Sequence, residues 1–327
     1  MNFGRRFLFP QKQWEERKKA RTLSWISLAF LVSTAILMYI TLGQSEAMKT
    51  AWVEDLLGMV PPAVLLIAMR IELKDPNKRF PYGYFRVISV SFLITSAVLA
   101  LAGLWLLYDA LTTLLGKERP PVGTVVLFGH QFWLGWAMIA ALVYCVIGSV
   151  ILGYQKRPVA EELHDKALDS DADMNKAGWM SEGAAIIGIL AVGLGYWWGD
   201  AVAAGFISLN IVRDGIRNLR EVLADLMDES PTKLGGLEVE SLPQKIAKAA
   251  EKLDWVKKAS ARFREQGHVL NGELFVVPTS NKVKVSDIED ASRELSKLDW
   301  RIYNLTVMPV SELENGVLPK TRVSADE

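Results

Sequence analysis

Three long stretches without a single Asp, Glu, Lys or Arg constrain what this chain can fold into. They cover residues 22–45, 87–108 and 122–155, and His130 is the one histidine among them. A helix that crosses a membrane needs about 20 mainly apolar residues. Each stretch is long enough, so the chain is predicted to cross a bilayer at least three times.

Three further apolar segments are shorter and have polar or charged edges. They cover residues 52–69, 176–198 and 201–213. Spans of this kind need protein neighbours or water at their polar faces, so they are predicted to line a pathway through the bundle. Together the six segments predict an α-helical membrane protein with six transmembrane helices over residues 22–227, preceded by a cytosolic segment at residues 1–21.

The distribution of basic residues predicts the orientation. Sixteen Lys and Arg fall in the N-terminal segment and in the connections after the second and fourth spans, whereas three fall on the other side. The side richer in Lys and Arg faces the cytoplasm, so both termini are expected there. No cleavage site follows the first apolar stretch, and the compact six-span form favours a bacterial inner membrane.

The chain becomes ordinarily polar after Asp228. Periodicity in this part predicts a helix over residues 242–253, strands over 258–264 and 273–277, a helix over 286–298 and a strand over 300–308. Ser286 and Glu289 have the spacing of a capping box at the start of the second helix. Residues 228–313 are therefore expected to form a small cytosolic α+β domain, followed by a flexible tail at 314–327.

Composition excludes several functions. The formal net charge is +0, which gives no case for nucleic acid as a partner. One cysteine, Cys145, excludes a disulfide framework, and three histidines leave few nitrogen ligands for a metal. The sequence has no Ser/His/Asp order, phosphate-binding loop or HExxH motif, so it is not expected to be an enzyme.

Two adjacent acids, Glu54 and Asp55, lie at the start of the second apolar segment. A carboxylate within a membrane span is costly, so it usually faces a cavity and takes part in function. Pro61 and Pro62 follow in the same segment and predict a kink, which either opens space beside Asp55 or serves packing alone. Asp55 could otherwise be a helix-start acid at the membrane surface, where the helix dipole favours it.

Residues 79–86, 172–182, 198–204 and 226–231 form four short motifs, which together resemble the cation diffusion facilitator family of divalent-metal/proton antiporters. Residues 79–86 read RFPYGYFR and resemble the family's basic-aromatic loop after its second helix. Residues 172–182 read ADMNKAGWMSE and occupy the place of its fifth-helix metal motif. Residues 198–204 and 226–231 resemble the start of its sixth helix and its junction to the cytosolic domain.

The resemblance implies a homodimer whose C-terminal domain is ferredoxin-like. It also implies metal ligands on helices two and five, in pairs four residues apart on one helix face. This sequence departs from that pattern. The fifth-helix positions fall at about Met174 and Gly178, and Asp55 has Met59 four residues on.

Nearby residues offer oxygen ligands instead. The predicted metal site consists of Asp55, Glu54, Asp173, Asn175 and Glu182. Oxygen ligands suit Mg, Mn or Fe(II) better than Zn. No resident cofactor is expected, and the cargo is a divalent cation, with Mn, Fe and Zn as candidates, exchanged for protons that the same carboxylates carry.

Two alternatives stay open at this point. Lys176 could pair with one of the nearby acids, which would make a salt bridge and not a metal site. A chain with Gly178 at a ligand position could also be a non-transporting structural or regulatory member of the family, with a degenerate site.

Overall fold

A computed structural model describes residues 9–116, 123–127, 130–234, 238–280 and 282–313. The chain forms two compact units, which are described separately. The helical unit comprises Gln13–Ile71 and Val87–Leu223, and the second unit comprises Met1–Lys12, Glu72–Arg86 and Ala224–Glu327.

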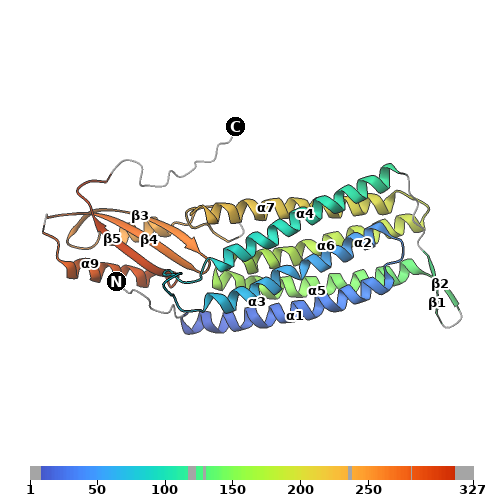
Figure 1. Ribbon diagram of the computed structural model, residues 1–327, viewed down its shortest axis with the longest axis horizontal. Helices are drawn as coiled ribbons and strands as arrows, with labels where there is room; N and C mark the ends of the chain where they lie inside the picture. The colour runs from blue at the N-terminus through green and yellow to red at the C-terminus, as the bar shows by residue number, and fades with distance from the viewer. Residues whose placement is uncertain (1–8, 117–122, 128–129, 235–237, 281, 314–327) are drawn as a thin grey trace. The chain divides into compact units, whose positions relative to one another are not determined.

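The helical unit is a bundle of long helices (Figure 1). A small antiparallel hairpin, β1 (Thr124–Leu127) and β2 (His130–Trp133), precedes α5. The helices of this part are α1 (Gln11–Thr41), α2 (Glu46–Gly58), α3 (Val60–Glu72), α4 (Val87–Leu115), α5 (Leu134–Leu163), α6 (Lys166–Gly193) and α7 (Gly199–Leu226).

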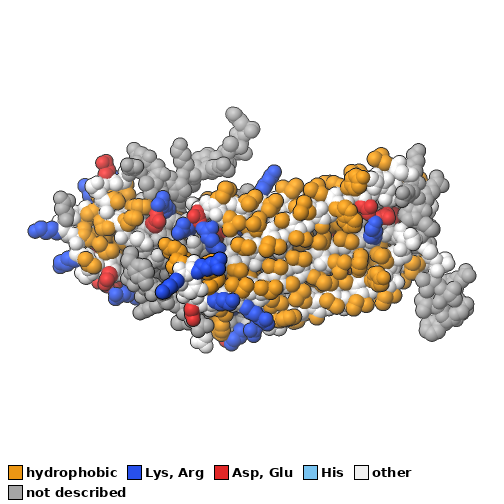
Figure 2. All heavy atoms as spheres, in the orientation of Figure 1, with side chains coloured by type: hydrophobic (Ala, Val, Ile, Leu, Met, Phe, Trp, Pro, Cys, Tyr) orange, Lys and Arg blue, Asp and Glu red, His pale blue; other side chains and the backbone are white. Residues whose placement is uncertain are grey.

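Four segments are long and apolar enough to cross a membrane: α1, α2 with α3, α4, and α5. Hydrophobic side chains cover the face of the bundle that Figure 2 shows. Leu101 and Tyr154 are among the most exposed large hydrophobic residues of the helical unit. An apolar surface of this extent is stable against lipid and not against water. The helices α6 and α7 have 28 residues each and are not among these four segments. The described residues thus confirm a helical membrane protein, with four of the six predicted spans meeting these criteria.

The second predicted span begins earlier than expected and is divided. It starts at Glu46, six residues before the predicted start at Trp52, and breaks at Met59 between α2 and α3. Pro61 and Pro62 lie in the first turn of α3, and their missing N–H groups remove two bonds that a continuous helix would make. The sequence predicted a kink at the proline pair, and the structure has a break between two helices just before it, at Met59.

Close backbone packing joins α4 to α7. A Cβ added to Gly103 would lie 2.9 Å from the backbone nitrogen of Val212, and one added to Gly215 would lie 2.6 Å from that of Ala100. Any larger side chain would push the two helices apart. Small residues at such crossings allow helices to associate in membranes, where van der Waals packing replaces the hydrophobic effect.

The C-terminal part has the predicted order of helix, strand, strand, helix, strand. The strands form one sheet in the order β3-β4-β5, in which β3 and β4 are antiparallel and β4 and β5 are parallel. Its elements are α8 (Leu242–Ala250), β3 (Val256–Gln266), β4 (Val269–Pro278), α9 (Val285–Leu295), a 3-10 turn (Ser296–Leu298) and β5 (Ile302–Pro309).

The predicted capping box at Ser286 is wrong. The helix α9 begins at Val285, so its cap is Lys284, whose backbone N–H donates to Asp287 Oδ2 at 3.4 Å. The spacing of the pattern was right but its position was off by two residues, because the apolar Val285 joins the first turn.

The C-terminal part contains a buried cluster of charged residues around Arg301. Arg301 donates to both carboxylate oxygens of Glu240, at 2.9 and 2.8 Å, and also to Asp299. Burial alone would lower the pKa of Arg301, but its hydrogen bonds to Glu240 and Asp299 outweigh this effect and raise the pKa above its ordinary value. The charge is thus held in place by two carboxylates.

Candidate metal site

A cavity of about 60 Å³ lies inside the helical unit. A water molecule needs roughly 10–15 Å³ on this measure, so the cavity has room for a cation with a few waters. Six helices contribute to its wall. The lining residues are Leu31, Ala51, Glu54, Asp55, Gly58, Leu99, Ser149, Asp171, Met174, Asn175, Gly178, Glu182, Ile211 and Asp214.

The helix α2 brings Glu54 and Asp55 to this cavity. Because α2 begins at Glu46, both acids lie in its third turn, about 12 Å along the axis from its first residue. They are therefore not helix-start acids. Asp55 Oδ2 also lies 3.9 Å from Cys145 Sγ of α5.

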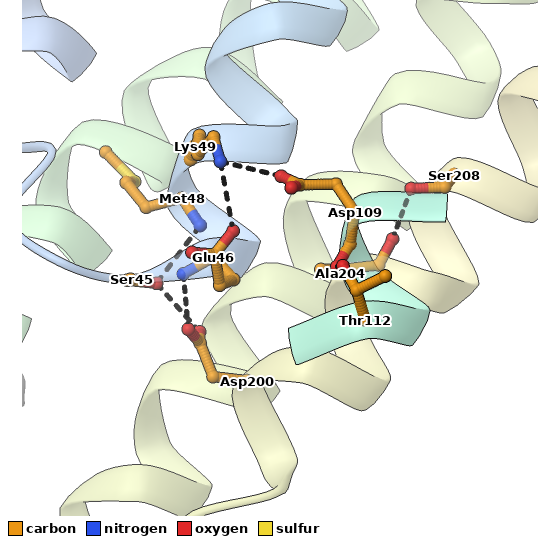
Figure 3. A network of polar contacts seen from close by, with 9 residues as sticks. All are labelled: Ser45, Glu46, Met48, Lys49, Asp109, Thr112, Asp200, Ala204 and Ser208. Atoms are coloured by element: carbon orange, nitrogen blue, oxygen red, sulfur yellow. Dashed lines mark hydrogen bonds and ion pairs between the residues drawn. The ribbon is translucent and has the colours of Figure 1, made fainter. Parts of the chain in front are cut away.

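A polar network fixes the first turn of α2 (Figure 3). Asp200 of α7 accepts hydrogen bonds from the Ser45 hydroxyl, at 2.7 Å, and from the backbone N–H of Glu46. Lys49 donates to Asp109 of α4 at 2.6 Å and to Glu46 at 3.4 Å. Carboxylates at a helix N-terminus are favoured by its free N–H groups and its dipole. The network therefore joins α2 to α4 and α7 and sets the position of the acids farther along α2.

The helix α6 presents one face to the cavity. Asp171, Asn175, Gly178 and Glu182 follow one another at spacings of four, three and four residues, which places them on one side of a helix. The Asn175 amide nitrogen donates to the Asp171 carbonyl at 2.7 Å, so the amide oxygen is the atom that a cation could use.

Glu182 differs from the other residues of this face in its hydrogen bonding. Its side chain is 4% exposed, and Oε1 lies 3.5 Å from the Ser149 hydroxyl. Oε2 has no hydrogen-bond partner among the residues that the structure describes. The charges of Asp55 and Glu54 act on Glu182, so the three carboxylates share one electrostatic environment. Buried carboxylates of like charge repel one another unless a cation or a proton compensates them.

Asp173 lies away from the cavity. It lines a different pocket together with Tyr154 and Arg157, and its Oδ1 is 3.8 Å from Arg157 Nη1. The structure thus brings four of the five predicted site residues, Glu54, Asp55, Asn175 and Glu182, to one cavity and leaves Asp173 out. The side chain of Lys176, predicted as an alternative partner of these acids, lies outside the described residues.

Sequence reasoning did not place three polar residues at the cavity: Asp171, Asp214 and Ser149. Asp171 pairs with Lys156 at 2.6 Å, and the two side chains are 4% and 0% exposed. The four-three-four spacing from Asp171 to Glu182 was the signal that could have found Asp171. Asp214 and Ser149 are on other helices, so spacing within α6 carries no information about them.

The carboxylates line one cavity, but their oxygens do not converge on a single position for a metal ion. Among the residues that the structure describes, no group of three or more His, Cys, Asp or Glu side chains is arranged to hold a metal ion. The donors that face the cavity are carboxylate, amide, hydroxyl and thioether groups, with oxygen in the majority. Hard divalent cations with hydration water fit this set, since water completes their coordination.

Comparison with known proteins identifies the family of this chain. The family described as Cation efflux transmembrane domain matches residues 21–227. The chain therefore belongs to the cation efflux family, also called the cation diffusion facilitator family, whose members are transporters and not enzymes.

Three relatives illustrate the range of the family. The chain is 25% identical to the manganese efflux system protein MneS of Bacillus subtilis over 288 residues, which cover 88% of this chain and 92% of MneS. It is 24% identical to the magnetosome protein MamB of Paramagnetospirillum magneticum over 53% of this chain and 54% of MamB. It is 23% identical to the mitochondrial metal transporter 2 of Saccharomyces cerevisiae over 80% of this chain and 58% of the yeast protein.

Proposed function

We propose that this protein exports a divalent metal cation across a membrane in exchange for protons, by alternating access to the cavity between α2 and α6. The observation that carries the proposal is the group of carboxylates at that cavity, Glu54, Asp55 and Glu182, within a bundle that shows an apolar face in Figure 2. Acids in such a place are costly unless a cation or proton neutralises them. Competition of the two for the same oxygens couples their movements.

The cargo belongs to the harder divalent cations, with Mn²⁺ first and Fe²⁺ second. Carboxylate and amide oxygens favour these ions over Zn²⁺, which prefers nitrogen and sulfur ligands. Two relatives support Mn²⁺ as the first candidate, because MneS and MneP of Bacillus subtilis are manganese efflux system proteins.

The surrounding architecture completes the proposal. In this proposal the chain crosses the membrane six times, with α6 and α7 as the last two spans, and both termini lie in the cytoplasm of a bacterial cell. The distribution of Lys and Arg supports this orientation. The C-terminal α+β part joins two copies into a homodimer, as the family resemblance implies.

Metal-driven proton flux in proteoliposomes tests the proposal. We expect flux with Mn²⁺, and a loss of more than about a hundredfold for Asp55→Asn, because a neutral amide is a weaker ligand and cannot carry the exchanged proton. Purified protein that is folded but gives no flux with Mn²⁺, Fe²⁺, Zn²⁺, Co²⁺ or Cd²⁺ would refute the transport function.

A second candidate is a non-transporting member of the family. Gly178 favours it, since this residue lines the cavity where a ligand side chain is expected. A Cβ at Gly178 would lie 4.0 Å from Ser149 Oγ, so the cavity accommodates a larger residue there. If the parent chain is inactive and Gly178→Asp produces flux, the second candidate is correct; flux in the parent eliminates it.

A further inference from the structure

The break between α2 and α3 leaves a backbone carbonyl without its helical donors. In a helix the carbonyl of Gly58 would accept from the N–H of residue 62, or from residue 61 in a tighter turn. Both residues are prolines, which have no N–H. The next donor along the chain, the Ala63 N–H, is bonded to the Met59 carbonyl at 3.2 Å.

Gly58 lies at the wall of the cavity. Glycine has no side chain, so the atoms that it contributes to this wall are backbone atoms. Glu54 precedes Gly58 by four residues and lies on the same helix face. At this position the family resemblance implies a second ligand, and the sequence alone offers no side chain for it.

We propose that the Gly58 carbonyl oxygen, freed by Pro61 and Pro62, is a ligand of the transported cation and replaces the missing carboxylate on this helix. The inference rests on the proposed function, because it names a ligand of the same cavity. A carbonyl oxygen is a neutral, hard donor of the kind that Mn²⁺ and Ca²⁺ accept. Within a membrane, irregular backbone that lines a cavity commonly serves cations in this way.

Two further observations favour a binding role for this break over a packing role. The prolines remove the α-helical donors of two carbonyls, those of Leu57 and Gly58. The Leu57 carbonyl accepts from the Met59 N–H and its residue is not part of the cavity wall, whereas Gly58 lines the cavity. The space at Gly58 is also not tight. An added Cβ would lie 3.8 Å from Leu31 Cδ2, an ordinary contact, so close packing does not require glycine here.

Equilibrium binding of Mn²⁺ to the full-length protein in detergent, measured by titration calorimetry, tests the inference with two variants. Pro62→Ala restores the N–H that would bond the Gly58 carbonyl in an α-helix, while every side-chain ligand is kept. Pro61→Ala is the matched control, because it restores the N–H four residues after Leu57, which is off the cavity wall, and relieves a similar ring clash.

We expect Pro62→Ala to weaken Mn²⁺ binding about tenfold, and Pro61→Ala to stay within about twofold of the parent. Equal affinities for Pro62→Ala and the parent would overturn the inference, as would equal losses for the two proline variants, which would indicate the kink itself. A parent chain that binds no Mn²⁺ would overturn Mn²⁺ as the proposed cargo, and this inference with it. Binding by the parent together with an unaffected Pro62→Ala overturns the inference alone.

Discussion

Two acids on the same helix, Asp171 and Glu182, show two ways of burying a carboxylate in a membrane. They lie about three turns apart and both line the cavity. Asp171 is held by the fully buried Lys156 at 2.6 Å, whereas Glu182 has one oxygen without a partner among the described residues. The pair at Asp171 is complete within the protein. In the proposed function, the free oxygen of Glu182 gains its partner when a proton or a cation enters the cavity.

The charges of Asp171 and Glu182 are expected to have opposite effects on the stability of the fold. A buried charge that has its partner contributes to the fold, and removal of that partner leaves an uncompensated charge. A buried charge without a partner destabilises the fold and persists where function requires it. Substitutions that remove the charge but keep the shape should therefore move stability in opposite directions at the two positions.

The largest expected effect is the loss of transport in Glu182→Gln. The amide removes a charge from the cavity, so Mn²⁺ flux in proteoliposomes should fall by more than about a hundredfold. The thermal midpoint of unfolding should rise or stay the same, because a buried unpaired charge is lost. Full flux in this variant would show that Glu182 is not part of the binding site.

Asp171→Asn should have the second largest effect, and on stability. Loss of the carboxylate leaves the Lys156 ammonium buried without its partner, at a cost of about 3–5 kcal/mol in the free energy of unfolding. Denaturant unfolding of the purified protein measures this cost.

A double variant separates the ion pair from the individual residues. Replacement of both partners, Lys156→Met with Asp171→Leu, should recover most of the lost stability, since apolar pairs often substitute for buried ion pairs. An Asp171→Asn variant as stable as the parent would contradict the proposed difference between Asp171 and Glu182.

The smallest expected effect is that of Asp173→Asn, which is two residues from Asp171 but off the cavity. Its contact with Arg157 is long, at 3.8 Å, and the two side chains are 32% and 50% exposed. Pairs of this kind contribute about 0–1 kcal/mol, so both stability and Mn²⁺ flux should stay near the parent values. A large loss of flux would return Asp173 to the site that the sequence predicted.

The contrast between Asp171 and Asp173 also shows where sequence reasoning reached its limit. The fifth apolar segment was expected to begin at Lys176, three residues after Asp173. The helix begins ten residues earlier, at Lys166, capped by Asp165. Along a continuous helix, residues two apart point in widely different directions, so one of the two acids faces the cavity and the other does not.

The order of the C-terminal elements was predictable because alternation and helical spacing are local properties. The cavity depends on contacts between helices far apart in the sequence, such as the approach of Ser149 to Glu182 across α5 and α6. Local patterns carry no such information. The acids of α2 were found because a charge within an apolar segment is itself a signal, whereas Asp214 and Asp171 lie in segments that already contain several charges.

Diffraction from crystals grown with Mn²⁺, with data collected at the manganese absorption edge, tests the central claim most directly. We predict an anomalous peak within the cavity, bounded by Glu54, Asp55, Asn175 and Glu182. A peak beside Asp173 and Arg157, or peaks confined to the C-terminal part, would contradict the account.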